Sequence, residues 1–531
     1  MRKIIIVLLC STAIPSLARA DDTKPAVPQF KEETRSAGIE SVYSGEWEYM
    51  AGGGVATFDC NGDGFPDMLL AGGASPAKFY RNTSARGGEL HFVADKSGLE
   101  LDHVTGAYPI DVDGDGNIDL VLLRVGENVV MRGLGQCRFE RANEQWGFAG
   151  GDAWSTAFSA TWERDANWPT IAVGNYIDRT KDTEPWGSCT DNWLQRPDGQ
   201  NRKFSSPVAL KPSYCALSML FTDWNRSGTP SLRVSNDREY YEGGQEQLWR
   251  MEPGKAPSLY TDADGWKLLR IWGMGIAETD IDGSPAYFMT SMADNRLQVL
   301  ANFTPGESPK PTYKEVAFQK GVTAHRPYEG DDLKPSTAWH AQFEDVNNDG
   351  LDDLFIAKGN VAKMLDFAAK DPNNLLLRQP DGKFLEVGNK AGVDSTASSR
   401  GAAVVDLNLD GLPDLVVVNR WENAQVWRNV SSNAGHFIEV KLEQQGANRD
   451  AIGAWIEVKH GTTVTRRELT VGGGHASGSL GFVHFGLGSA EAAQIRVQWP
   501  GGEWSQTHDI TGDTFSVIKR NSSKVSYWEL K

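Results

Sequence analysis

The chain has 531 residues, 40% of them hydrophobic, and a formal net charge of −17. This length suggests two to four domains, or one large ring-shaped domain with an appendage. The acidic balance argues against a nucleic-acid partner. Beyond the N-terminus no stretch approaches the roughly 18 consecutive apolar residues of a transmembrane segment. None of these properties indicates an oligomeric state.

Residues 1–20 have the pattern of a secretory signal peptide, with a basic start, an apolar run from Ile4 to Cys10 and small residues at the end. We therefore predict cleavage before Asp21 and a secreted or periplasmic location. Loss of three basic residues with the leader would make the mature net charge −20. Lipidation of Cys10 is the less favoured alternative, because Leu9 is larger than the residue that usually precedes such a cysteine.

The mature chain keeps four cysteines: Cys60, Cys137, Cys189 and Cys215. An exported protein can hold them as disulfides, and their spacing fits no zinc pattern. Cys189 and Cys215 flank a polar stretch that has the character of an insertion, so we predict that they pair and close it. Whether Cys60 pairs with Cys137 stays open.

An acidic phrase occurs four times, as DCNGDGFPD, DVDGDGNID, DVNNDGLDD and DLNLDGLPD. Each copy has Asp at positions one, five and nine, Asp or Asn at position three, and Gly at position six. We call these loops one, two, six and seven. With position seven included for its backbone carbonyl, the candidate metal ligands are Asp59, Asn61, Asp63, Phe65 and Asp67; Asp111, Asp113, Asp115, Asn117 and Asp119; Asp345, Asn347, Asp349, Leu351 and Asp353; and Asp406, Asn408, Asp410, Leu412 and Asp414.

Oxygen ligands at alternate positions with a glycine turn are typical of calcium loops. The loops are not EF-hands, because position twelve is apolar in every copy and a short apolar run typical of a buried strand follows each ninth residue. A set of tight solvated turns is the alternative, but the same positions in four copies argue against it. Magnesium is less suitable than calcium for so many protein oxygens. We predict about four structural Ca²⁺ ions.

Three weaker copies lie between loops two and six, at 162–170, 223–231 and 278–286. The seven copies start about 58 residues apart on average, which is close to the length of a propeller blade. The sequence therefore predicts an all-β fold with a seven-bladed β-propeller. The copy at 162–170 has lost its ligands and should be empty, whereas occupancy of 223–231 and 278–286 stays open.

A second phrase, an aromatic residue or Leu followed eight residues later by Gly, precedes most copies. It occurs at residues 30–39, ahead of loop one, but not after loop seven. The segment near Phe30 should therefore supply the last strand of the last blade and close the ring, which removes free sheet edges.

The acidic loops resemble the FG-GAP (VCBS-type) repeats of integrin α-subunit propellers, and this resemblance implies calcium in each such loop. Residues 434–520 resemble the UnbV/ASPIC domain through GHFIEVKL, GANRDAIGAWIEV, RRELTVGGGHASG, VHFGLG and VQWPGG. The combination is similar to the cartilage acidic protein family, including its bacterial secreted members. We expect a signal peptide at 1–20, an integrin-α-like propeller at 21–433, a UnbV/ASPIC-like domain at 434–520 and a tail at 521–531.

The strand-like alternation of HFIEVKLE and AWIEVK predicts that the C-terminal domain is a small antiparallel β-sandwich or barrel packed on the propeller. Two functions remain in view. The first is an exported binding, adhesion or scaffold module for a protein or glycan ligand, with no catalytic residues. The alternative is a propeller-based enzyme that acts on extracellular polysaccharide or a small molecule, with its site over the propeller axis.

Three residues bear on that choice. His475, in GGGHASG, is the one histidine in a glycine-rich setting, and a packing role is favoured over a catalytic one. Trp186 and Trp193, in the insertion, are the tryptophans that best suit a sugar-binding surface.

Overall fold

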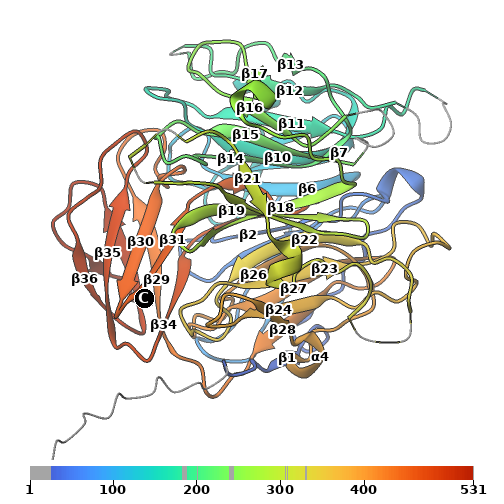
Figure 1. Ribbon diagram of the computed structural model, residues 1–531. Coiled ribbons are helices and arrows are strands. Elements are labelled where there is room, and N and C mark those ends of the chain that lie inside the picture. Colours follow the sequence, from blue (N-terminus) through green and yellow to red (C-terminus); the bar gives the residue numbers. More distant parts are fainter. Residues whose placement is uncertain are drawn as a thin grey trace, which may run out of the picture.

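The computed structural model describes residues 25–529 except 182–187, 200, 238–243, 305, 308, 329 and 331. The predicted signal peptide lies outside the described residues. The described chain is almost entirely β-structure, and Figure 1 shows a large body of strands with a smaller group of orange and red C-terminal strands at one side. Among the described residues no helix is long and apolar enough to cross a membrane.

The large body consists of seven successive antiparallel units of four strands in the described residues. Unit one contains β2 (Val55–Phe58), β3 (Asp67–Leu70), β4 (Lys78–Asn82) and β5 (Phe92–Ala94). Unit two contains β6 (Val104–Ile110), β7 (Asp119–Gly126), β8 (Val129–Gly133) and β9 (Phe139–Arg141). Unit three contains β10 (Ala153–Thr161), β11 (Thr170–Asn175), β12 (Asn192–Gln195) and β13 (Val208–Leu210).

The remaining units follow the same order. Unit four contains β14 (Ala216–Thr222), β15 (Ser231–Asn236), β16 (Gln247–Arg250) and β17 (Ser258–Leu259). Unit five contains β18 (Gly273–Ile281), β19 (Ser284–Ser291), β20 (Arg296–Leu300) and β21 (Tyr313–Glu315). Unit six contains β22 (Ala338–Glu344), β23 (Asp353–Lys358), β24 (Asn374–Arg378) and β25 (Phe384–Glu386). Unit seven contains β26 (Ser398–Val405), β27 (Asp414–Arg420), β28 (Gln425–Asn429) and β1 (Phe30–Glu32).

Strand β1 confirms the predicted pairing of the N-terminal segment with the last repeat. Phe30 lies opposite Asn429 and Glu32 opposite Trp427, in antiparallel register. The first strands of neighbouring units contact one another, and β26 of unit seven contacts β2 of unit one. The N-terminal strand is therefore held by the last unit, about 400 residues away along the chain.

The recurring aromatic-to-Gly phrase corresponds to the outer strand of a unit followed by one helical turn. These turns are α1 (Asn143–Trp146), α3 (Ala317–Lys320) and α4 (Gly388–Ala391). Each ends at a glycine with positive φ: Gly147, Gly321 and Gly392. Glycine adopts this left-handed conformation at little cost, which explains its place in the phrase. Two 3-10 turns, Trp47–Tyr49 and Asp262–Asp264, complete the helical segments described.

The C-terminal part forms two four-stranded sheets. One has the order β34 (Val483–Gly488), β29 (His436–Glu443), β37 (Thr514–Lys519) and β38 (Ser526–Tyr527); the other has β31 (Thr463–Glu468), β30 (Trp455–His460), β35 (Ala492–Gln498) and β36 (His508–Thr511). Alternate residues of β35 are buried, as expected of a strand with one face on a core. Most pairs are antiparallel as predicted, but β29 and β37 run parallel. Strand β38 adds part of the expected tail to the sheet.

One segment of the C-terminal part enters the large body. Strand β32 (Val471–Gly472) pairs with β10 and β14, and β33 (Gly478–Leu480) pairs in parallel with β2. Between them, Gly474 bridges to Ile276 and Ser477 to Ala107. These partners all belong to first strands, from units one to five. The chain's own residues 471–480 therefore fill the space between the first strands.

Candidate metal centres

Each of the four acidic loops joins the first strand of a unit to the second, as the sequence predicted. They connect β2 to β3, β6 to β7, β22 to β23 and β26 to β27. The ninth residue of every loop is the first residue of the second strand, and all four are completely buried. The apolar run after each ninth residue is the buried second strand itself.

The first Asp of every loop holds the turn through two backbone N–H groups. In loop one, Gly62 and Gly64 donate to the two carboxylate oxygens of Asp59, at 2.7 and 2.9 Å. The same position in loops two, six and seven accepts two N–H groups at 2.7–3.2 Å. The glycine at position six has φ between +84° and +91° in all four loops. This conformation explains why position six is always glycine.

The ninth Asp ties the loop to the rest of its unit. One oxygen of Asp67 accepts the N–H of Cys60 at 3.1 Å, and the other accepts the N–H of Asn82, on the third strand, at 2.8 Å. The equivalent carboxylates Asp119, Asp353 and Asp414 make the same two bonds. The sequence proposed these residues as ligands, but it did not show that they also tie the loop to the second and third strands.

Positions three and five lie side by side. In loops one, six and seven, the amide of the position-three Asn donates to the position-five Asp at 2.8, 3.1 and 3.1 Å. In loop two, carboxylate oxygens of Asp111, Asp113 and Asp115 lie within 4.8 Å of one another. The residue at position seven donates its N–H to position five in each loop. The side chains that the sequence proposed as ligands are therefore gathered at each loop.

The ninth-position carboxylates are buried, as are Asp111, Asp345 and Asp406 at position one, and few basic groups face them. In the described residues, ion pairs to the loop carboxylates occur only in loop two, from Arg132 and Arg449. Burial raises the pKa of Asp67 to about 7 and that of Asp119 to about 8. A carboxylate is costly to bury unless a cation neutralises it. This environment fits a divalent cation.

Asn408, at position three of loop seven, gives a second indication. Its side chain is completely buried, and its Oδ1 atom has no hydrogen-bond partner. Asp406, at position one of the same loop, is 5% exposed. A buried acceptor without a donor calls for an explanation, and a bound ion is one of them. Oxygen donors of this kind are the ligands that calcium prefers.

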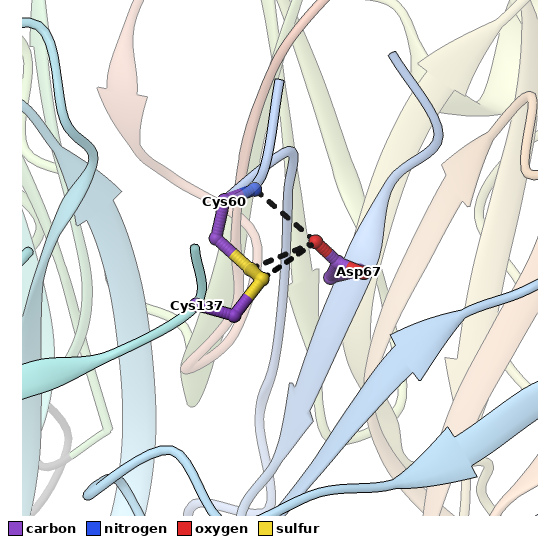
Figure 2. A group of neighbouring side chains, drawn as sticks. All are labelled: Cys60, Asp67 and Cys137. Carbon is purple, nitrogen blue, oxygen red and sulfur yellow. Dashed lines mark hydrogen bonds between the residues drawn. A yellow bond between two sulfur atoms is a disulfide. The ribbon is translucent and has the colours of Figure 1, made fainter. Parts of the chain in front are cut away.

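Two disulfides join the four mature cysteines. Cys189 pairs with Cys215, as predicted, and Cys60 pairs with Cys137, which settles the pairing left open by the sequence. Figure 2 shows Asp67 directed at the Cys60–Cys137 disulfide. One carboxylate oxygen of Asp67 lies 2.8 Å from Cys60 Sγ and 3.6 Å from Cys137 Sγ. Because both sulfurs are in the disulfide, this group is not a thiolate metal site. The bond links loop one to the β8–β9 connection of unit two.

The C-terminal part covers the acidic loops. Gly435 and Gly488 donate their N–H groups to the carbonyls of Asn347 and Asn348 in loop six, at 3.1 and 2.8 Å. His484 contacts the side chain of Asn348 at 2.7 Å. Phe437 and Phe515 form an apolar cluster with Phe65 of loop one and Leu409 of loop seven. The sequence predicted that this part packs on the repeats, but no local pattern indicated that it covers the acidic loops.

The weaker copies do not form equivalent loops throughout. At 162–170, Glu163 pairs with Arg196 at 2.6 Å instead of serving a metal. At 223–231, Asp223 still accepts two N–H groups at 2.8 Å, from Ser227 and Gly228. At 278–286 the strands pair as far as Ile281 and Ser284, so that only a two-residue hairpin connects them. Glu278 and Asp280 consequently lie within β18 and not in a loop.

The residues considered for an enzyme or sugar site are placed differently. His475 is fully buried; its Nε2 accepts the N–H of Gly52 at 3.0 Å, and its ring packs on Trp339. Burial lowers its pKa to about 3. It therefore has the packing role that the sequence favoured. Trp193 is half-buried against Phe148, and Trp186 lies outside the described residues.

Two families match parts of the chain. Residues 444–525 match the family described as ASPIC and UnbV, and residues 59–122 and 345–417 match the FG-GAP-like repeat. The repeat matches contain loops one, two, six and seven. A search of curated proteins gave no match.

Solved structures with a similar arrangement are distant in sequence. BBS1N in its complex with ARL6DN is 11% identical, covers 77% of this chain and 99% of that chain, and has a TM-score of 0.44. An Agrocybe aegerita lectin that recognises non-reducing terminal N-acetylglucosamine is 14% identical over 72% and 94% of the two chains, with a TM-score of 0.38. The Dos1 propeller is 11% identical over 78% and 96%, with a TM-score of 0.36. The likeness concerns a propeller-like fold alone.

Proposed function

We propose that this chain is an exported calcium-binding propeller that serves as a binding, adhesion or scaffold module. It combines FG-GAP-like repeats with a C-terminal ASPIC and UnbV domain, which is the architecture of the cartilage acidic protein family. Its ligand is a protein or a glycan. The N-terminal pattern of residues 1–20 and the two disulfides support export to an oxidising compartment.

The proposed architecture is a closed seven-bladed propeller in which each four-stranded unit is one blade. Support comes from the seven units, from the β1–β28 pairing and from the contact between β26 and β2. The propeller occupies residues 21–433 and is followed by a small β-sandwich at 434–520 and a tail at 521–531. Two facing sheets around a shared apolar core support the sandwich.

Four Ca²⁺ ions are proposed, one in each of loops one, two, six and seven. The unpartnered buried oxygen of Asn408 beside Asp406 is the observation that carries this assignment. Side-chain oxygens of positions one, three, five and nine and the carbonyl of position seven would hold each ion. The ion would supply positive charge that offsets the repulsion among the carboxylates. Its role is structural.

A binding role is favoured over the enzyme alternative because of residues 471–480. These residues pair with the first strands of units one to five at the position where an axial site would lie. The C-terminal domain covers the face that carries the acidic loops. The opposite face carries exposed aromatic side chains, among them Trp47 and Trp421 at 42% and 40% exposure. Ligand binding is therefore assigned to that face.

Two measurements test the proposal. Elemental analysis of the purified protein, before and after dialysis against chelator, should find about four calcium ions that the chelator removes. Glycan arrays and pull-downs from the native envelope fraction, carried out with calcium, should identify a ligand whose binding is lost in a Trp47→Ala, Trp421→Ala double variant. Absence of calcium would reject the metal assignment, and unchanged binding by the double variant would reject the assigned face.

A further inference from the structure

Arg132, on β8, forms ion pairs with two carboxylates of loop two. Its Nε atom lies 3.0 Å from Asp113 Oδ2, and one terminal nitrogen lies 3.0 Å from Asp115 Oδ2. The other oxygen of Asp113 accepts the N–H of Asp115 at 3.1 Å, and that of Asp115 accepts the N–H of Asn117 at 2.8 Å. Every oxygen of the two carboxylates at positions three and five therefore has a donor.

Loop two needs this partner because it differs from the others at position three. Loops one, six and seven have an Asn there, and its amide donates to the position-five Asp. Asp113 cannot donate a hydrogen bond in its ionised form. Loop two has four Asp ligands where the other loops have three, and Arg132 offsets the additional negative charge.

Arginines occupy the equivalent position in two other units, but they point elsewhere. Arg81 and Arg428 each precede the residue whose N–H is bound by the ninth Asp, as Arg132 does. Arg81 pairs with Asp95 at 3.6 Å, and Arg428 pairs with Glu33 at 3.1 Å. Both acidic partners immediately follow the fourth strand of their unit.

Unit two lacks that acidic partner. The residue that follows β9 is Ala142, which is 1% exposed. Units five and six have no arginine at the equivalent position, where the strand register places Val299 and Leu377. Their residue after the fourth strand is Val316 or Val387. Among units one, two, five, six and seven, only unit two has the arginine without an acidic residue after its fourth strand. The guanidinium of Arg132 contacts loop two instead.

We propose that Arg132 acts as an internal competitor of calcium at loop two and lowers the affinity of this site below that expected from its four carboxylates. The inference rests on the proposed calcium function. A cation that uses Asp113 and Asp115 must first displace the guanidinium, whereas in loops one, six and seven the Asn amide only has to rotate so that its oxygen faces the ion. Loop two, with the strongest calcium signature in the sequence, is then not the tightest site.

Calcium titration by calorimetry on the chelator-treated full chain, at constant ionic strength, tests this inference. Arg132→Met removes the charge and keeps an apolar stem like that of arginine, without altering the buried Ala142 position. Ala142→Glu gives Arg132 an acidic partner like Glu33. Arg81→Met is the matched control, because Arg81 is held by Asp95. Arg132→Met combined with Asp111→Ala assigns any change to loop two.

Arg132→Met and Ala142→Glu should each bind one ion about tenfold more tightly than wild type, as expected for removal of two partly exposed ion pairs. The Arg81→Met protein should match wild type, and Asp111→Ala should abolish the gain. Unchanged or weaker binding by Arg132→Met would overturn the inference, because the arginine would then be irrelevant or would help to orient the ligands. If neither wild type nor Arg132→Met binds calcium, the proposed function fails together with the inference; calcium binding with equal affinity in both refutes the inference alone.

Discussion

Gly486 of the C-terminal domain lies directly against Asp345 of loop six. A Cβ atom added to Gly486 would stand 1.9 Å from Asp345 Oδ2, and also 2.6 Å from the Cα atom of Asn348. The domain interface and a proposed calcium ligand are therefore in contact at this point. Any side chain here must displace either the carboxylate or the loop backbone.

Gly486→Ala should lower the free energy of unfolding by about 1–3 kcal/mol, the usual cost of forcing atoms into a packed site. It should also reduce the bound calcium by one ion, because Asp345 would leave its position. Gly481→Ala is the matched control, since no atom lies within 4 Å of its added Cβ. Denaturant unfolding and elemental analysis measure the two effects. Equal behaviour of the two variants would contradict the contact.

Calcium removal should destabilise the protein. Extracellular calcium modules bind at about 10⁻⁴ to 10⁻³ M, so each site should contribute roughly 0.4–1.4 kcal/mol at millimolar calcium, or about 2–6 kcal/mol for four sites. Asp406→Ala should remove one ion and the contribution of one site, and the difference from wild type should shrink in chelator. Asp111→Ala should do the same at loop two. Asp152→Ala, with a 92% exposed side chain, is the control. An unfolding midpoint that is the same with calcium and with chelator, and the same in wild type and both Asp→Ala variants, would exclude metal sites in these loops.

Acid should weaken the protein through two buried histidines. Nδ1 of His340 accepts the N–H of His475 at 3.0 Å. Burial lowers the pKa of His340 to about 4 and that of His475, which also faces Arg400, to about 3. The unfolded chain takes up these protons near pH 6.5, so stability is present at neutral pH and is lost as the pH falls below about 6.5. Each histidine should account for about 2 kcal/mol between pH 7 and pH 5.

His340→Asn keeps an acceptor for the N–H of His475 and removes one of the two groups. The variant should therefore lose about 2 kcal/mol less than wild type over the same pH interval, measured by denaturant unfolding at constant calcium. Identical pH profiles of the two proteins would show that His340 does not carry this dependence. His91→Asn, at an exposed histidine on the surface, serves as the control.

Loss of the disulfide between Cys60 and Cys137 should cost about 2–5 kcal/mol, because the bond restricts the unfolded chain over a separation of 77 residues. The double variant Cys60→Ser, Cys137→Ser tests this by denaturant unfolding. The matching variant of Cys189 and Cys215, with a separation of 26, should lose about 1 kcal/mol less. A larger loss from the shorter loop would show that chain entropy does not set the order.

Short-range sequence patterns were sufficient to predict where the acidic loops and the strands after them lie. The loop phrase placed each ninth Asp at the start of a buried strand, because local turn chemistry and apolar runs act within a few residues. The same patterns left the occupancy of 278–286 open, and there the strands pair as far as Ile281 and Ser284 and leave room for only a two-residue hairpin. A repeat can keep the turn-like phrase without forming a long loop, because the pairing of the two strands over the whole hairpin decides how many residues remain to connect them.

The sequence by itself determined the repeat, the pairing of the segment near Phe30 with the last repeat, the side chains gathered at each acidic loop and the Cys189–Cys215 bond. Only the tertiary structure decided what lies against them: Gly486 beside Asp345, Arg132 on loop two, and residues 471–480 between the first strands. The physical reason is range. Turns and strands follow from neighbours in the chain, whereas the partner of a buried charge comes from any element that packs against it, and those elements meet only when the whole chain has folded.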